Sequence, residues 1–461
     1  MNTTEATSQT LTLQPVHRLL GHYTPPPDKS IAHRALILSA MAEGRSTVHP
    51  VTNSADVQST ASCLRQLGVS IEVVDDTWVI ESPGIRNWSA PERALDCGNS
   101  GTTMRLLAGC LAGRPFASEL IGDESLSQRP MARIAIPLRK MGALIELAEG
   151  DTPPITIKPS SLRGIEYELP IASAQVKSAI LLAGLDADGA TTITETYATR
   201  DHTERMFRYA EVDCETLHPP RPADRREQLL ENPDAARDDT PNYHHKIVLG
   251  ERRTVRRTDW EIPGDFSTAA YVIAAAAVVR RSEVIIANVG INPTRTTFLK
   301  VLRRMGAQVD FEKREQSGGE PVGTLRVTSA KQLKAVRVGR AEVPGLIDEL
   351  PILAVLAGRA EGITVIRGAG ELRHKESDRI ATVTENLRAV GVKVAELEDG
   401  WAIEGPSEWK GTTINPHGDH RIAMAFGVAG HWADGPTQLL NPECVKISAP
   451  DFFNTMAALS R

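Results

Sequence analysis

Four segments of the chain repeat one pattern of apolar and polar residues. Each begins with apolar residues at helical spacing, passes through a glycine, and ends in a run of alternating or β-branched residues. Glycine suits the end of a helix because the backbone there often adopts a positive φ. The pattern predicts a helix, a glycine cap and a strand in SCLRQLGVSIEV from Ser62, IPLRKMGALIEL from Ile136, KVLRRMGAQVDF from Lys300 and ENLRAVGVKVAE from Glu385.

A second element, a polar turn with Gly or Ser that runs into a helix of small apolar residues, recurs six times. The copies begin near residues 28, 98, 173, 264, 345 and 418, a spacing longer than that of solenoid repeats. Helices so rich in Ala and Gly suit close packing in a bundle, whereas exposed helices would carry more charge. The six copies therefore predict an α/β protein of six βαβαββ-like units, grouped as two domains of three.

Composition adds the size and setting of such a protein. The chain has 461 residues, of which 41% are hydrophobic, enough for sizeable cores. No apolar run reaches the roughly 18 residues of a membrane helix, and MNTTEATSQT lacks the basic and apolar regions of a signal peptide. We therefore expect a cytoplasmic protein with no membrane partner.

The five cysteines and the net charge exclude other classes. Cys63, Cys97, Cys110, Cys214 and Cys444 are scattered and lack CxxC spacing, so we expect buried thiols and neither a disulfide framework nor a zinc site. A net charge of -6 argues against a nucleic-acid partner.

Cations nevertheless gather in or beside the recurring polar turns. A helix N-terminus with Gly or Ser in its turn and a basic side chain nearby is a common anion site. Six such turns predict a protein that binds a small polyanion, although each alone is ordinary loop composition. The cations are Lys29, Arg34, Arg105, Arg129, Lys177, Arg200, Lys375, Arg379 and Arg421.

The stretch LRHKESDRI, residues 372 to 380, is the most charged of these turns. Taken alone, it can be a solvated helix start, with Ser377 or Asp378 as the cap. Lys375 and Arg379 are four residues apart and share one face of the helix start, with Glu376 offset by one residue.

Eight motifs of this chain resemble those of the 5-enolpyruvylshikimate-3-phosphate synthase family, in the same order. They are DKSIAHRA, GNSGTTMRLLAG, DESLSQRPM, SAQVKSAILLAG, TRDHTERM, LIDELPILA, RHKESDRI and DHRIAMAF. RDHTE (200 to 204), SAQVK (173 to 177) and NPTR (292 to 295) further resemble class II, a branch that includes glyphosate-tolerant members.

The resemblance implies the enolpyruvyl transferase fold, two domains of three βαβαββ units each in an inside-out α/β barrel-like arrangement. Residues 1–25 and 262–461 would form the C-terminal-type domain, and residues 26–261 the N-terminal-type domain. Two crossings, near Pro25 to Asp28 and Glu261 to Asp265, would join them. Residues 214–258 are so rich in Pro and charge that we expect a polar surface insertion without a core, with a short helix at DRREQLLEN.

The family transfers the enolpyruvyl group of phosphoenolpyruvate to the 5-hydroxyl of shikimate 3-phosphate, a step of aromatic amino acid biosynthesis, without metal or organic cofactor. We expect the two substrates as the partners of a monomer. By resemblance, the catalytic residues are Asp348, Glu376 and Lys29. Shikimate 3-phosphate would be held by Lys29, Ser30, Arg34, Ser173, Ala174, Gln175, Arg200, Asp348 and Lys375. Phosphoenolpyruvate would be held by Lys29, Gly101, Arg129, Gln175, Arg379 and Arg421.

Other interpretations compete with this one. The sister enzyme acting on UDP-N-acetylglucosamine shares the fold but usually carries a reactive Cys, and an RNA 3'-phosphate cyclase shares the repeat unit. A non-catalytic anion-binding relative is a third. Among single residues, Glu349 beside Asp348 can be a helix cap, Asp378 is favoured as a cap or a partner of an arginine, and His202 and His420 are favoured as structural.

Overall fold

Residues 10–218 and 245–461 are described by the computed structural model. Their contacts divide the chain into two compact units, each built around its own hydrophobic core. Unit 1 contains residues 10–29 and 263–461, and unit 2 contains residues 30–218 and 245–262. The unit boundaries therefore fall after residues 29 and 262, close to the crossings predicted from the sequence, and Lys29 lies in unit 1.

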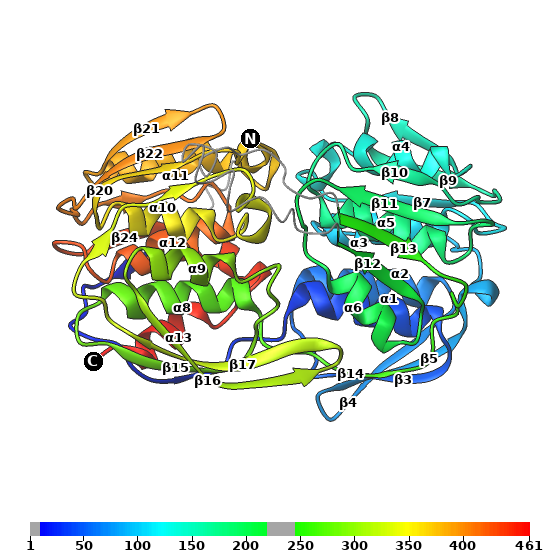
Figure 1. Ribbon diagram of the computed structural model, residues 1–461, viewed down its shortest axis with the longest axis horizontal. Helices are drawn as coiled ribbons and strands as arrows, with labels where there is room; N and C mark the ends of the chain where they lie inside the picture. Colours follow the sequence, from blue (N-terminus) through cyan, green and yellow to red (C-terminus); the bar gives the residue numbers. More distant parts are fainter. Residues whose placement is uncertain (1–9, 219–244) are drawn as a thin grey trace, which may run out of the picture. The chain divides into compact units, whose positions relative to one another are not determined.

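In the described part of the chain, each unit contains three small sheets with one shared topology (Figure 1). The first strand of a sheet pairs parallel to the second, and the second and fourth strands both pair antiparallel to the third. In unit 2 the sheets are β14 (Asp259–Glu261), β3 (Glu43–His49), β5 (Thr77–Pro83) and β4 (Ser70–Val74); β6 (Leu95–Asp96), β7 (Ser118–Ile121), β9 (Thr152–Lys158) and β8 (Leu144–Ala148); and β10 (Glu166–Glu168), β11 (Thr191–Glu195), β13 (His245–Leu249) and β12 (Cys214–Leu217).

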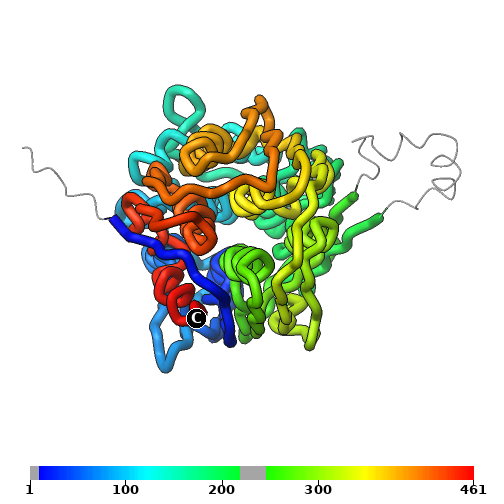
Figure 2. Tube along the Cα trace, turned by 90° about the vertical axis from the view of Figure 1, so that its left-hand side faces the viewer, coloured from blue at the N-terminus to red at the C-terminus, as the bar shows by residue number. Residues whose placement is uncertain are grey.

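Unit 1 repeats this topology with strands from both ends of the chain, except that the last of its sheets has three strands and lacks the fourth. Its sheets are β2 (Leu20–Tyr23), β15 (Glu283–Gly290), β17 (Glu320–Thr328) and β16 (Gln308–Ser317); β18 (Leu333–Lys334) and β19 (Arg337–Val338) beside β20 (Ala360–Ile366), β22 (Gly400–Gly405) and β21 (Lys393–Leu397); and β23 (Thr413–Ile414), β24 (Thr437–Leu440) and β1 (Thr10–Leu13). Figure 2 shows the blue N-terminal segment beside the red helix α13 (Phe452–Leu459), where Leu19 pairs with Ser460. The N-terminal strands thus belong to unit 1.

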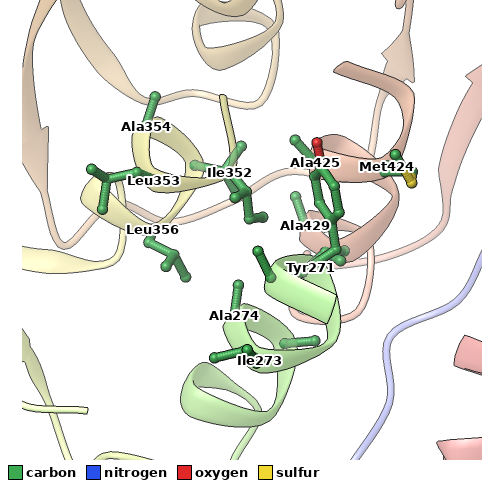
Figure 3. Close-up of a cluster of buried hydrophobic side chains, with 14 of the residues drawn as sticks. Tyr271, Ile273, Ala274, Ile352, Leu353, Ala354, Leu356, Met424, Ala425 and Ala429 are labelled. Carbon is green, nitrogen blue, oxygen red and sulfur yellow. The ribbon is translucent and has the colours of Figure 1, made fainter. Parts of the chain in front are cut away.

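The six predicted polar turns all lead into buried helices. The helices are α1 (Lys29–Met41), α3 (Gly101–Leu111), α5 (Ala174–Gly184), α8 (Phe266–Val278), α10 (Leu350–Ala357) and α12 (His420–Ala429). In α8 every residue from Phe266 to Ala277 is buried. The side chains of α8, α10 and α12 pack against one another in the core of unit 1 (Figure 3). The prediction from their small-residue composition is confirmed.

Helices α3 and α5 of unit 2 show why small residues are needed there. A Cβ added at Gly109 would lie 2.4 Å from the carbonyl oxygen of Ala179, a distance that real Cβ atoms do not show. Glycine therefore lets the two helix backbones approach each other directly, and a larger residue would separate them.

The predicted helix–glycine–strand pattern is confirmed at all four positions. Helices α2 (Ala55–Gln66), α4 (Ala132–Lys140), α9 (Thr297–Arg304) and α11 (Arg379–Ala389) each end near a glycine whose φ lies between 90° and 102°. In each case an arginine of the last turn donates to the carbonyl oxygen six residues ahead, in the strand that follows. The pairs are Arg65 with Ile71, Arg139 with Ile145, Arg303 with Val309 and Arg388 with Val394.

A fifth helix is connected to its strand by the same arginine–carbonyl hydrogen bond but lacks the glycine. Helix α6 (His202–Tyr209) is followed by Glu211 at a φ of 62°, and Arg208 donates to the carbonyl oxygen of Cys214 at 3.2 Å. Because an ordinary side chain stands at the position of positive φ, the glycine pattern could not reveal this copy.

The expected insertion at residues 214–258 is wrong at both ends. Strands β12 and β13 pair antiparallel within a sheet of unit 2, and Ile247, Leu249 and Val255 are buried in its core. Their apolar residues alternate over only a few positions, a signal that the surrounding prolines and charges obscured. Residues 219–244, which include the predicted helix at DRREQLLEN, lie outside the described residues.

The two crossing segments lie side by side where they enter unit 1. The Asp28 N–H donates to the carbonyl of Pro263 at 2.8 Å, and the Asp265 N–H donates to the carbonyl of Pro26 at 2.7 Å. Between them, a Cβ on Gly264 would lie 2.8 Å from both Pro25 and the carbonyl oxygen of Asn288. Backbone hydrogen bonds therefore tie the crossings together just ahead of Lys29.

Candidate active site

Two helix starts in unit 1 carry a cluster of charged side chains. Asp378 caps α11, its Oδ1 accepting from the N–H groups of Ile380 and Ala381 at 3.0 Å, so the predicted cap is confirmed. Asp419 caps α12 by accepting from the Arg421 N–H at 2.9 Å. These caps place Arg379 and Arg421 in the first turns of their helices.

Arg379 is held from three sides by carboxylates. Its Nε lies 2.8 Å from Asp419, one Nη lies 2.5 Å from Glu376, and the other lies 3.6 Å from Asp348. The side chain is 1% exposed. Burial alone would lower the pKa of the guanidinium, but Asp419 and Glu376 outweigh it and raise the pKa, so Arg379 is a permanent cation.

Asp348 lies between two guanidinium groups. Its Oδ2 is 3.3 Å from Arg421 Nη2, and its Oδ1 faces Arg379. The carboxylate of Asp348 is the first of the charges that raise the pKa of Arg421 against the effect of burial. Both carboxylates predicted to move protons keep access to solvent, because the side chain of Asp348 is 16% exposed and that of Glu376 is 26% exposed.

His420 lies in the same cluster but cannot carry a proton at neutral pH. Burial, together with the charges of Lys29 and Arg421, lowers its pKa to about 3. Its two ring nitrogens are buried without a hydrogen-bond partner among the described residues. The neutral histidine fits the predicted structural role and places no positive charge beside the arginines.

Lys375 and Lys29 complete the set of predicted residues in unit 1. Lys375 Nζ lies 3.5 Å from Glu371, one turn earlier, and its side chain is 27% exposed. Lys29 begins helix α1 and is the last residue of unit 1. Unit 1 thus contains four cations and two carboxylates that the sequence singled out: Lys29, Lys375, Arg379, Arg421, Asp348 and Glu376. Among them, the two arginines and the two carboxylates are in direct contact.

In unit 2, Arg34 is fixed by hydrogen bonds to three partners. Its guanidinium donates to Thr203 Oγ1 at 2.8 Å, to Ser178 Oγ at 2.9 Å and to the carbonyl of Ser30 at 2.8 Å. The hydroxyls belong to α6 and α5, so three helices of unit 2 hold one cation. Thr203 and Ser178 were missed by sequence reasoning because lone hydroxyls in helices carry no motif.

The predicted residues of the SAQVK motif lie at the start of α5. Ser173 caps the helix, Ala174 is its first residue, and Gln175 Oε1 accepts from Arg105 at 2.7 Å. The side-chain amide of Gln175 also donates to Thr102 Oγ1 at 3.0 Å. Side-chain hydrogen bonds therefore join the starts of α3 and α5.

Arg129 is oriented by the side chain of Asn99, in the turn that precedes α3. Its Nη2 donates to Asn99 Oδ1 at 2.9 Å, and the amide of Asn99 donates in turn to Asp123 at 2.8 Å. The turn before α3 thus brings Arg129 near Gly101, where an added Cβ would lie 3.5 Å from Arg129 Nη1.

Lys177 is not an anion-binding cation, contrary to the sequence-based expectation. Its side chain is fully buried, with Nζ 2.7 Å from Glu204 and 3.2 Å from Glu195. Glu195 also accepts from the hydroxyl of Thr199 at 2.8 Å, which anchors the loop before Arg200. The motif placed Lys177 beside a turn but could not show that it faces inward along α5.

Replacing Lys177 by methionine should therefore destabilise unit 2. The change leaves two buried carboxylates without their cation, which typically costs about 3 to 5 kcal/mol. Burial is the main cause that raises the pKa of Glu204, and without the opposing charge of Lys177 that pKa should rise further. A carboxyl group whose pKa is raised in the folded state makes the protein less stable as pH rises. The loss of unfolding free energy in the variant should therefore be larger at pH 8 than at pH 5.

Urea unfolding at both pH values measures this deficit. The matched control is Lys393→Met, because Lys393 forms an exposed pair with Glu404 and its loss should cost no more than about 1 kcal/mol. A deficit that is the same at both pH values would contradict the buried-carboxylate explanation.

The described residues hold neither a metal-binding cluster nor a membrane-spanning helix. Among residues 10–218 and 245–461, no group of three or more His, Cys, Asp or Glu is arranged to hold a metal ion. Over the same residues, none of the helices has both the length and the apolar character needed to cross a membrane.

The cysteines do not support the sister enzyme with a reactive thiol. Cys110 and Cys214 are buried, and burial raises the pKa of each thiol to about 12. Neither would form the thiolate that a nucleophilic cysteine requires at neutral pH.

Known proteins match the chain over nearly its whole length. A family model described as EPSP synthase (3-phosphoshikimate 1-carboxyvinyltransferase) matches residues 13–221 and 224–456. The 3-phosphoshikimate 1-carboxyvinyltransferase of Lactiplantibacillus plantarum is 45% identical over 453 residues, which cover 98% of this chain and 99% of that protein. The Bacillus subtilis enzyme of the same name is 42% identical over 448 residues, covering 97% and 98%.

Solved structures agree with the sequence comparisons. An EPSP synthase from Acinetobacter baumannii matches with a TM-score of 0.82 at 39% identity, covering 98% of both chains. The enolpyruvyl transferase NikO from Streptomyces tendae, at 18% identity and a TM-score of 0.73, shares the fold. The chain belongs to the EPSP synthase (3-phosphoshikimate 1-carboxyvinyltransferase) family.

Proposed function

We propose that this protein transfers the enolpyruvyl group of phosphoenolpyruvate to the 5-hydroxyl of shikimate 3-phosphate and releases phosphate. The observation that carries the proposal is the cluster in unit 1, where two carboxylates with access to solvent contact buried arginines. The arginines suit the phosphate and carboxylate of phosphoenolpyruvate, while the carboxylates suit the two proton transfers of the reaction. Family membership supports the same activity.

Each reacting atom has a candidate partner. Asp348 accepts the proton of the 5-hydroxyl as the hydroxyl oxygen bonds to C2 of phosphoenolpyruvate. Glu376, which must be protonated at this stage, donates a proton to the methylene carbon. The resulting tetrahedral intermediate then expels phosphate, which leaves with the proton that Asp348 took up. Glu376 takes back a proton from the methyl carbon to restore the double bond. Lys29, Arg379 and Arg421 stabilise the negative charge of phosphoenolpyruvate and of the leaving phosphate.

Binding of the acceptor substrate draws on different residues. Shikimate 3-phosphate needs cations for its phosphate and carboxylate and neutral donors for its hydroxyls. In unit 2, Arg34, Ser173 and Gln175 are already oriented by hydrogen bonds or a helix cap, which reduces the ordering that binding would require. The remaining proposed ligands are Lys29, Ser30, Ala174, Arg200, Asp348 and Lys375.

A phosphate-release assay with both substrates tests the proposal. Phosphate should appear only when phosphoenolpyruvate and shikimate 3-phosphate are present together, with equal yields of phosphate and enolpyruvyl product. Transfer to UDP-N-acetylglucosamine instead would assign the sister activity, and absence of both would assign a non-catalytic relative.

Gly101→Ala probes the proposed phosphoenolpyruvate pocket. The new Cβ would lie 2.7 Å from Arg105 Nη1, so Arg105 must move and its hydrogen bond to Gln175 is disturbed. Overpacking of this kind typically costs on the order of 1 to 3 kcal/mol, and we expect the longer inhibitor glyphosate to lose more affinity than phosphoenolpyruvate. Inhibition constants and KM values measure both effects, and equal losses would show that Gly101 does not shape the inhibitor's end of the pocket.

The domain assignment, location and assembly are proposed with the same function. Units 1 and 2 would be the C-terminal-type and the N-terminal-type domain. A monomer in the cytoplasm is expected, which light scattering and cell fractionation test.

A further inference from the structure

A second buried network in unit 1 centres on Arg295, in the NPTR turn before α9. Its side chain is 3% exposed. Nη1 forms an ion pair with Asp28, and Nη2 donates to Ser267 Oγ at 2.6 Å and lies 3.5 Å from Asp265. One guanidinium thus contacts a crossing segment and the start of α8.

The turn that carries Arg295 is itself fixed. Asn292 Oδ1 accepts from the N–H and the hydroxyl of Thr294 at 2.9 and 2.8 Å, and the Arg295 N–H donates to the carbonyl of Asn292 at 2.9 Å. The amide of Asn292 donates to Glu320 at 2.9 Å. A turn held by side chain and backbone gives the arginine a defined position.

The network leads to the neighbours of two proposed catalytic residues. On one side, Asp28 directly precedes Lys29. On the other, Ser267 Oγ donates to Glu349 Oε1 at 2.5 Å, and Glu349 directly follows Asp348. Glu349 is 1% exposed, stands at the N-cap of α10 and makes no side-chain capping bond there, so its carboxylate serves the contact with Ser267 instead.

A purely structural role explains this arrangement poorly. Burying a guanidinium and several carboxylates is rarely more stable than packing apolar side chains in the same space. The network does, however, hold Asp28, which precedes the proposed lysine, and Glu349, which follows the proposed base. Displacements on the order of 1 Å at reacting groups can reduce a rate by about 100-fold.

We propose that Arg295 is a positioning residue, which sets Lys29 through Asp28 and Asp348 through Ser267 and Glu349. The inference rests on the proposed function and assigns Arg295 no contact with substrate. Its two branches have separate consequences, because Lys29 binds phosphoenolpyruvate as well as stabilising the leaving phosphate, whereas Asp348 accepts the hydroxyl proton.

Three variants separate the branches in steady-state kinetics. Ser267→Ala cuts the branch to Glu349 and should lower kcat by about 10- to 100-fold with little change in KM. Asp28→Asn weakens the branch to Lys29 and should mainly raise KM for phosphoenolpyruvate, by a similar factor. Arg295→Lys keeps the positive charge but loses the guanidinium group that contacts Asp28 and Ser267 at once. It should therefore both lower kcat and raise KM for phosphoenolpyruvate.

Arg114→Lys is the matched control for loss of a buried guanidinium. Arg114 is 5% exposed, pairs with Asp186 and donates to the carbonyl of Ile85 at 2.8 Å in unit 2. The Arg114→Lys substitution should lower the thermal midpoint of unfolding while leaving kcat and KM unchanged. If the three network variants also lose only stability, the positioning role is overturned.

A readout without turnover separates this inference from the proposed function. The labelling rate of Lys29 by an amine-reactive ester, followed by mass spectrometry, should change by about threefold or more in Asp28→Asn and Arg295→Lys. Both variants disrupt the pair between Asp28 and Arg295 and so change the position of the neighbouring amine. The rate should stay constant in Arg114→Lys. Changed labelling in a protein that releases no phosphate would overturn the proposed function alone, whereas unchanged labelling in an active enzyme would overturn the network.

Discussion

Replacing Glu376 by glutamine should reduce turnover by about 100- to 10,000-fold, the usual contribution of a positioned acid or base. The amide cannot give a proton to the methylene carbon or take one back. Exchange of solvent deuterium into the methylene group of phosphoenolpyruvate should fall in parallel. The affinity for shikimate 3-phosphate, measured by calorimetry, should stay near that of the wild type because Glu376 is not among its proposed ligands.

The fold should tolerate this change. Arg379 keeps Asp419 at 2.8 Å and Asp348 at 3.6 Å after the pair with Glu376 is lost, so no buried cation is left alone. Glu385→Gln on the same helix is the matched control, since Glu385 pairs with His417 at the surface and should not affect turnover. More than about a tenth of wild-type turnover in Glu376→Gln would show that another group moves the proton.

Asp348→Asn should give a loss of similar size, about 100- to 10,000-fold in kcat, for a different reason. The hydroxyl of shikimate 3-phosphate then lacks an acceptor for its proton. At the same time, Arg379 and Arg421 lose a carboxylate that competes with the anionic substrate. The variant should therefore bind phosphoenolpyruvate at least as tightly as the wild type does, although its kcat is strongly reduced.

This combination distinguishes a catalytic from a structural role. A residue that only holds the two arginines in place would weaken phosphoenolpyruvate binding when it is changed. Fluorescence titration and single-turnover kinetics measure the two effects separately. Glu342→Gln is the control in the same unit, because Glu342 pairs with Arg304 near the surface. Weaker binding with nearly normal single-turnover rates would rule out Asp348 as the proton acceptor.

The sequence by itself determined the repeated local structure of this protein. Helical spacing, a glycine at positive φ and a following strand depend on residues close together in the chain, so the pattern located α2, α4, α9 and α11 with their strands. The same holds for the six buried helices and for Asp378, whose capping bonds reach only two or three residues ahead. The ordered motifs also led to the family that the comparisons show.

Tertiary structure alone decided which segments and charges meet. β14 pairs with β3 across more than 200 residues, and β1 and β2 join unit 1 from the opposite end of the chain. Lys177 and Arg379 both follow helix caps, yet Lys177 is enclosed by Glu195 and Glu204 while Arg379 faces Asp348 and Glu376.

The physical reason is the range of the interactions. A cap or a helical period is satisfied within one or two turns of backbone, whereas an ion pair depends on which helix faces are brought together by burial of the apolar core. Arg295 shows the difference: the NPTR turn is readable as a local motif, but its contacts with Asp28 and Ser267 lie 267 and 28 residues away. Only the packing of α8 and the crossing segments around that turn links the arginine to Asp28 and, through Ser267, to Glu349, the residues next to Lys29 and Asp348.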